Sequence, residues 1–165
     1  MQDNQLKRNQ VKMRKATIDD LESILTLVMG FRNYLNLKSP FESEFRNGLK
    51  KLMSGNDAEF FVVSNNRNVI CGYILLRYRF SMWASGLEAR IEDLFVSPSH
   101  RQKGTGKELV KYAIQKATEK GCVTICLDTN ENNPVTMNMY TQLGFKAHKE
   151  RWKNGRQIFF RRPTN

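Results

Sequence analysis

Cysteine is scarce in this sequence, and long apolar runs are missing. The three cysteines, Cys71, Cys122 and Cys126, lie in apolar segments of a chain of 165 residues. Because an odd number at this spacing suits neither a disulfide framework nor a zinc site, we expect three buried thiols and no metal. No stretch reaches the roughly eighteen apolar residues of a membrane span, and residues 1–10 are polar with no apolar run. We therefore expect a cytoplasmic protein with no membrane partner and a poorly ordered tail at 1–10.

Acidic residues are also scarce relative to basic ones. The chain has 27 lysines and arginines against 16 acids, a formal net charge of +11. Residues 101–120 carry six of these basic residues and two acids, and residues 146–165 carry seven and one. Such concentrations of charge are typical either of a solvated basic surface or of a protein with a polyanionic partner. Charge alone leaves these two interpretations equally open, and the partner in the second would be a nucleic acid or a phosphate-bearing cofactor.

The apolar pattern of residues 11–165 predicts a single mixed α/β domain, large enough to bury a real core. Strands are expected at 11–16, 59–64, 69–80, 89–96 and 123–128, with a further pair at 145–152 and 157–161. Helices are expected after Thr17, over 41–53, from near Gly106 to Gly121, and from Asn133–Pro134 to Gly144.

The stretch SPSHRQKGTGKELVKYAIQKA at 97–117 runs from turn residues through two glycines into an amphipathic helix. A Walker loop does not fit, because it needs glycine at the position of Arg101 and serine or threonine at that of Glu108. A dinucleotide fingerprint does not fit either, because it needs glycine at the position of Leu109. What remains is R-x-x-G-x-G at a helix start, where Gly104 and Gly106 leave room for a ligand and backbone N–H groups converge on an anion. This pattern favours a pyrophosphate, with Lys103 and Lys107 able to reach phosphates. Glycines that merely close a tight loop are the alternative.

The order of elements, with EARIEDLFVSPSHRQKGTGKELV and CVTICLDTNENNPVTMNMYTQLGF, resembles the GCN5-related N-acetyltransferase (GNAT) family over residues 11–161. The resemblance implies an α/β GNAT fold, in which a mixed, mostly antiparallel central sheet is flanked by helices and splays between its fourth and fifth strands. It also implies a homodimer, and acetyl transfer from acetyl-CoA to a primary amine by direct attack in a ternary complex. IEDLFV at 91–96, with Asn133–Pro134 and Tyr140, is similar to the diamine and polyamine (spermidine/spermine-type) branch.

The same resemblance implies which residues bind the coenzyme. The glycine loop corresponds to the family signature for the pyrophosphate, and a backbone N–H near Phe95 holds the acetyl carbonyl. Asn133 is implied to contact the pantetheine arm and Tyr140 to donate to the coenzyme sulfur, although a plain helix N-cap and a core aromatic also explain these two positions. The residues expected to bind acetyl-CoA are Leu94, Phe95, Val96, Arg101, Gln102, Lys103, Gly104, Thr105, Gly106, Lys107, Asn133 and Tyr140.

The chemistry requires a base as well as a coenzyme site. An attacking amine must be neutral, yet a lysine-like amine with a pKa of about 10.4 is less than about one part in a thousand neutral at pH 7. A positioned base is worth roughly a hundred- to ten-thousand-fold in rate. Glu92 is the catalytic candidate, because an acid in this apolar strand is otherwise costly to bury. Asp93 competes for the role, a salt-bridged carboxylate is the structural alternative, and strand alternation predicts Glu92 and Asp93 on opposite faces.

The acceptor is less defined by the sequence. Residues 30–45 and the aromatic patch around Trp83 lie where the family builds its acceptor cleft, and a net charge of +11 would repel a polyamine at long range. A small polyamine, an amino acid, an antibiotic and a protein amino group all stay open. A second class of function, a non-catalytic nucleic-acid-binding protein, would use the basic helix and tail, although the chain has no recognisable nucleic-acid motif. His100 and His148 have no matching partners and receive no catalytic role.

Overall fold

The computed structural model describes residues 11–147 and 160–164. Outside these ranges lie the expected tail at 1–10, His148, and most of the strands expected at 145–152 and 157–161. The described ends of those two segments have no strand structure. The chain divides into two compact units, with the boundary after Asp128. Among the described residues, none of the helices has the length and apolar character needed to cross a bilayer.

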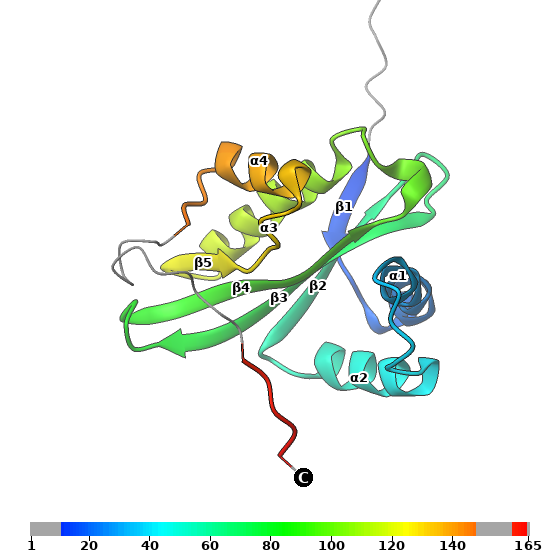
Figure 1. The fold of residues 1–165 in the computed structure, drawn as a ribbon, viewed down its shortest axis with the longest axis horizontal. Coiled ribbons are helices and arrows are strands. Elements are labelled where there is room, and N and C mark those ends of the chain that lie inside the picture. The colour runs from blue at the N-terminus through cyan, green and yellow to red at the C-terminus, as the bar shows by residue number, and fades with distance from the viewer. Residues whose placement is uncertain (1–10, 148–159, 165) are drawn as a thin grey trace, which may run out of the picture. The chain divides into compact units, whose positions relative to one another are not determined.

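A five-stranded mixed sheet forms the centre of the first unit (Figure 1). Its strands, side by side in chain order, are β1 (Lys12–Lys15), β2 (Ala58–Ser64), β3 (Ile70–Ser81), β4 (Gly86–Val96) and β5 (Thr124–Leu127). The first four pair antiparallel, and β5 pairs parallel with β4. The expected strands of this unit, and the mixed, mostly antiparallel sheet, are confirmed.

Helices cover both faces of this sheet. Helices α1 (Leu21–Tyr34) and α2 (Glu42–Ser54) lie on one face and α3 (Thr105–Glu119) on the other, as Figure 1 shows. Short 3-10 turns, η1 (Ile18–Asp20) and η2 (Pro98–His100), precede α1 and α3. At the first of these turns, the Asp20 carboxylate accepts hydrogen bonds from the Thr17 backbone N–H at 2.8 Å and from Arg14 at 2.6 Å. These bonds fix the entry of the chain into α1.

The core consists of apolar side chains on both faces of the sheet. The cluster under α1 and α2 includes Leu21, Ile24, Leu25, Leu27, Val28, Phe60, Val62, Tyr73, Leu75 and Phe95. On the other face, α3 buries Leu109, Val110 and Ala113, and Tyr112 meets Phe61 edge to face at 5.6 Å between ring centroids. Each large apolar side chain buried in this way stabilises the fold by about 1.5–3 kcal/mol. The central strands are therefore a rigid support for whatever β4 carries.

Strand β4 departs from a regular ladder in two ways. Its register with β3 shifts by one residue, because Leu75 lies opposite Asp93 and Leu76 lies opposite Ile91. Glu92 is thus the extra residue of a β-bulge. Pairing with β5 runs from Glu88 to Ile91 and, in the described chain, no further. Residues 92–96 of β4 therefore continue beyond the end of β5, which is the splay that the fold class predicts.

The second unit contains one helix among its described residues, α4 (Pro134–Gln142). Asn133 is its N-cap, and the side-chain Oδ1 accepts a hydrogen bond from the Thr136 backbone N–H at 3.2 Å. Gly144 ends the helical segment with a φ of 87°, in the left-handed region that glycine favours. The helix expected between Asn133 and Gly144 is confirmed.

Candidate active site

The bulge brings Glu92 and Asp93, the two neighbouring acids of β4, to one face of the sheet. Asp93 lies on the face that α1 and α2 cover, and its Oδ2 accepts a hydrogen bond from the Tyr73 hydroxyl at 3.4 Å. Glu92 reaches Arg77, with 3.5 Å between Oε2 and Nη1, and Arg77 shares its face with Ala58 of the same core cluster. The expectation that Glu92 and Asp93 point to opposite faces is therefore wrong. At a bulge, two successive side chains point to the same face of the sheet, whereas successive side chains of a regular strand point to opposite faces.

The two carboxylates have different surroundings. Asp93 is partly buried, and this burial, followed by the negative charge of Glu92, raises its pKa. The hydrogen bond from Tyr73 acts in the opposite direction. The side chain of Glu92 is 46% exposed and faces Arg77, which Asp57 holds at 2.7 Å. A raised pKa in a partly buried carboxylate is typical of a group that exchanges protons.

The splay leaves main-chain groups of β4 facing away from β3. Hydrogen bonds in an antiparallel ladder alternate, and the Ser97 N–H donates to the Cys71 carbonyl of β3 at 2.9 Å. By this alternation the N–H of Phe95 points to β3, whereas those of Leu94 and Val96 point to the open edge. Next to Phe95, the main-chain N–H groups directed away from β3 are thus those of Leu94 and Val96.

The glycine loop leads directly into the first turn of α3. Gly104 is the N-cap with a φ of 78°, and Gln102 before it is also left-handed at 61°. Helical hydrogen bonding begins at the Gly104 carbonyl, so the N–H groups of the first turn point out of the helix end. A Cβ built at Gly104 would meet no described atom within 4 Å, and one at Gly106 would meet Val96 alone, at 4.0 Å.

These two glycines therefore have different reasons to be glycine. The left-handed backbone requires Gly104, which closes the turn. Gly106 has no such backbone angle, and the space in front of it would accept a side chain. The backbone conformation thus explains the glycine at 104, whereas neither backbone conformation nor packing explains the glycine at 106. Main-chain N–H groups at the end of a helix, next to open space and Lys103, are a donor set that fits a pyrophosphate.

Arg101, the first residue of the signature, turns its side chain back into the fold. Its Nε donates to the Val96 carbonyl at 2.8 Å, and its guanidinium carbon lies 4.6 Å from the Tyr34 ring centroid and 5.1 Å from that of Phe95. Phe95 in turn stacks on Phe31 of α1 at 5.3 Å. Arg101 therefore joins the end of β4 to α1. The sequence pattern did not reveal this aromatic setting, because its residues come from two distant segments.

The remaining loop residues support the turn. Thr105 is buried, and its hydroxyl donates to the His100 carbonyl at 3.3 Å. The His100 ring lies within 2.9 Å of the Ser97 and Ser99 hydroxyls. Lys103 is exposed, with its Nζ 3.4 Å from the Ser99 carbonyl. His100 thus shapes the loop, and Lys103 extends along it.

The other two predicted residues lie in the second unit. The side-chain oxygen of Asn133 caps α4, which confirms the N-cap interpretation. Tyr140 is partly buried and meets Phe145 edge to face at 5.6 Å. Burial raises the pKa of the Tyr140 hydroxyl, which keeps it protonated and able to donate. The carboxylate pair and the glycine loop, by contrast, belong to the first unit.

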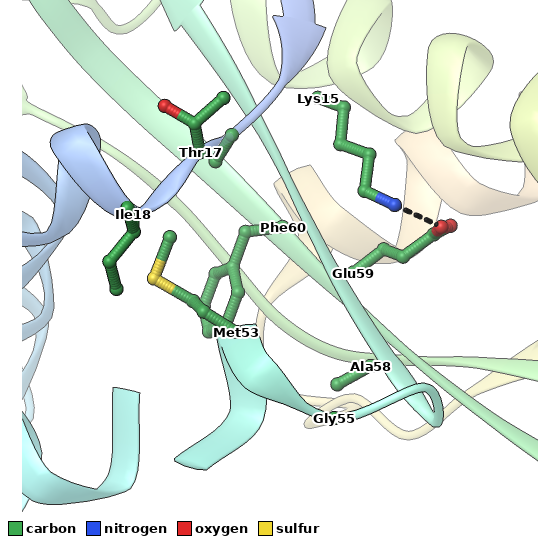
Figure 2. Close-up of a pocket in the computed structure, with 9 residues that line it drawn as sticks. Lys15, Thr17, Ile18, Met53, Gly55, Ala58, Glu59 and Phe60 are labelled. Carbon is green, nitrogen blue, oxygen red and sulfur yellow. Dashed lines mark hydrogen bonds and ion pairs between the residues drawn. The ribbon is translucent and has the colours of Figure 1, made fainter. Parts of the chain in front are cut away.

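Two hollows lie elsewhere in the first unit. One of about 70 Å³ is lined by Lys15, Glu59, Met53 and Phe60 among others, and Figure 2 shows Lys15 and Glu59 pointing toward one another across 2.6 Å. That volume holds about two water molecules, which is too little for an amine acceptor. A larger one of about 350 Å³ lies between α1 and α2.

Part of the segment expected to build an acceptor cleft lines the larger hollow. Gly30, Asn33 and Glu42 contribute to its wall. The apolar side chains of this segment and of the β3–β4 hairpin are largely exposed, namely Tyr34, Leu35, Leu37, Phe41, Phe80, Met82 and Trp83. Within the described ranges, no three His, Cys, Asp or Glu side chains come together as metal ligands.

The comparison with known proteins identifies the family. The model of the acetyltransferase (GNAT) family matches residues 21–145, so this chain belongs to that family. Thialysine N-epsilon-acetyltransferase of Bos taurus is 32% identical over 75 residues, which cover 46% of this chain and 44% of that protein. Aminoglycoside N(6')-acetyltransferase type 1 of Salmonella typhimurium is 26% identical over 137 residues, or 81% of this chain and 88% of that one. The alignment with the bovine protein thus spans less than half of its length.

A solved structure supports the same fold. Aminoglycoside N-acetyltransferase AAC(6')-Iy in complex with CoA is similar with a TM-score of 0.77 at 22% identity, covering 93% of this chain and 95% of that chain. The similar proteins thus include one named for a lysine analogue and two named for aminoglycosides. They do not single out the polyamine branch.

Proposed function

We propose that this protein is an acetyl-CoA-dependent N-acetyltransferase that transfers the acetyl group directly to a primary amine in a ternary complex. One observation carries the proposal. Strand β4 carries a carboxylate pair on one face and main-chain donors on its open edge, and the glycine loop at the start of α3 follows a few residues later. A direct transfer needs these three parts, a proton acceptor, a carbonyl donor and a phosphate site, close together.

The coenzyme would be held mainly by main-chain groups. The N–H groups of Leu94 and Val96 suit the acyl and pantetheine end, and the loop from Arg101 to Gly106 suits the pyrophosphate, with Lys103 and Lys107 nearby. Asn133 and Tyr140, which belong to the second unit, are further coenzyme contacts that the family resemblance implies. When bound, acetyl-CoA supplies the activated acetyl group as a thioester.

The residues of the chain handle the protons. The pair Glu92 and Asp93 takes a proton from the acceptor ammonium, which frees the nitrogen lone pair for attack. Tyr140, kept protonated by its burial, donates to the departing sulfur. The cysteines support direct transfer, because burial raises the pKa of Cys71, Cys122 and Cys126 and so disfavours the thiolate that an acetyl-enzyme would need.

The acceptor and the assembly also belong to this proposal. The amine carries an ammonium that the carboxylate pair attracts. The relatives suggest lysine-like compounds and aminoglycosides as the first panel, and the motif resemblance adds polyamines. A peptide lysine and an amino acid complete that panel. The homodimer that the family resemblance implies is tested by light scattering with and without acetyl-CoA.

A thermal-unfolding experiment tests the proposal first. Acetyl-CoA, ATP, NAD and a short oligonucleotide are compared at equal concentration. A ligand at a hundred times its Kd stabilises the fold by about 2.7 kcal/mol, which moves the midpoint of a domain of this size by roughly 5–11 °C. We expect a shift with acetyl-CoA alone, followed by amine-dependent release of thiol. Equal shifts with every polyanion would support the nucleic-acid-binding alternative instead.

A further inference from the structure

The bulge places two carboxylates side by side, yet β3 gives each a different neighbour. The Tyr73 ring is fully buried, and its hydroxyl donates to Asp93 Oδ2 at 3.4 Å. Arg77 lies four residues further along β3 and faces Glu92 at 3.5 Å. A neutral donor thus serves one carboxylate and a cation serves the other.

These neighbours set different roles. The guanidinium of Arg77 forms an ion pair with Glu92, so this carboxylate belongs to a network of charged side chains. Asp57 fixes this guanidinium at 2.7 Å, so that Arg77 stays close to Glu92. In the part of the chain that the structure describes, Asp93 forms no ion pair; it is partly buried and lies beside the negative charge of Glu92. Two acids with such different neighbours are suited to different tasks, one to bind a charged group and the other to exchange a proton.

We infer that Asp93 takes the proton from the acceptor amine while Glu92 holds the ammonium, with Tyr73 as the positioning residue of Asp93. This inference rests on the proposed function. The N–H bond of the ammonium breaks and an O–H bond forms on Asp93, which leaves the nitrogen lone pair free to bond the acetyl carbon. The C–S bond then breaks, and the sulfur leaves with the proton from Tyr140. The nitrogen, which still carries two hydrogens, loses one of these protons to solvent and becomes the neutral amide, and exchange with solvent returns Asp93 and Tyr140 to their starting states.

The surroundings of Asp93 determine its response to pH. Its titratable neighbours are Glu92 on its own strand and Tyr73 on β3, and helix α1 packs Phe31 against the adjacent Phe95. The Tyr73 hydroxyl stabilises the ionised carboxylate. Removal of that hydroxyl raises the pKa of Asp93, so the acid limb of kcat/KM moves to higher pH while the plateau at high pH is kept.

Four variants test the division of roles. Asp93→Asn should lower kcat by about a hundredfold or more with the KM for the amine changed less than about threefold, and Asp93→Glu should restore part of the loss. Glu92→Gln should raise that KM about tenfold or more and change kcat far less. Tyr73→Phe should shift the acid limb. A reversed pattern, with kcat lost in Glu92→Gln and retained in Asp93→Asn, overturns the inference.

A matched control and a second measurement keep the test independent of turnover. Tyr78 is another buried tyrosine of β3, and its hydroxyl donates to Glu59 at 2.6 Å on the opposite face, so Tyr78→Phe should leave the acid limb in place. Carboxyl carbon NMR of the free protein should show Asp93 titrating above the ordinary range of an aspartate, and higher still in Tyr73→Phe. Titration of Asp93 at or below that ordinary range refutes the inference. That NMR pattern with no thiol release from any amine refutes the proposed function instead.

Discussion

Replacement of Gly106 separates what the fold needs from what the coenzyme needs. A Cβ at this position meets one atom, of Val96, at 4.0 Å, and the backbone is not left-handed, so Gly106→Ala fits the folded chain. Alanine in a helix is more favourable than glycine by about 0.5–1 kcal/mol. The variant should therefore unfold at an equal or slightly higher temperature, by up to about 4 °C.

Coenzyme binding should change in the opposite direction. The added methyl group stands in the space that the first-turn N–H groups face, so we expect at least a tenfold loss of affinity for acetyl-CoA. That factor is about 1.4 kcal/mol, and it removes about 3–5 °C of the ligand-induced shift in the unfolding midpoint. Gly106→Val should abolish the shift, while calorimetric titration gives the affinities directly.

Gly48 provides the control for this experiment. It lies within α2, and a Cβ there meets no described atom within 4 Å. Gly48→Ala should raise the unfolding midpoint in the same way and leave the shift with acetyl-CoA unchanged. If Gly106→Val folds and binds acetyl-CoA like the unaltered protein, the assignment of the loop to the pyrophosphate is refuted.

Three further predictions concern single side chains. Tyr140→Phe should lower kcat by about a hundredfold or more without a change in coenzyme affinity, as single-turnover rates and calorimetry will show; an unchanged kcat excludes Tyr140 as the acid. Arg101→Met loses a charged hydrogen bond to Val96 and its contacts with two rings, together about 2–4 kcal/mol of folding free energy, measured by urea unfolding. An Arg101→Met protein of unchanged stability contradicts that role. The pKa of Asp93 is raised in the folded state, so protonated Asp93 favours the folded protein. This contribution to the free energy of unfolding is lost as pH rises through the folded pKa. Asp93→Asn should therefore match the unaltered protein near pH 3 and have the higher unfolding midpoint at pH 7; the opposite trend with pH would count against the burial of this charge.

The element order was within reach of the sequence because it depends on local signals. Thr17 marks the entry to α1, Asn133 caps α4 and Gly144 ends it, and each acts on its own segment. The glycine loop followed for the same reason, because Gly104 and Gly106 stand at the start of one amphipathic helix. Signals of this kind can be predicted from the sequence, because they do not depend on residues from distant segments of the chain.

The relation between Glu92 and Asp93 could not be predicted in this way. Simple alternation placed them on opposite faces, and the bulge depends on how β4 pairs with β3 over its whole length. The same limit applies to Arg101, whose partners Tyr34 and Phe95 come from separate segments. The sequence pattern identified both acids and the arginine but assigned the arginine to the ligand, because phosphate binding is the familiar role of that residue type.

Because of the bulge, the position of the two carboxylates depends on the number of residues in β4 as well as on their identity. A chain that lacked Glu92 would pair β3 with β4 without interruption, since the register on either side differs by this one residue. Such a chain would gain a regular ladder and keep every core side chain, the glycine loop and Asp93. Loss of a single codon would thus remove the carboxylate that holds the amine and leave the glycine loop and Asp93 in the chain, and insertion of one would restore it.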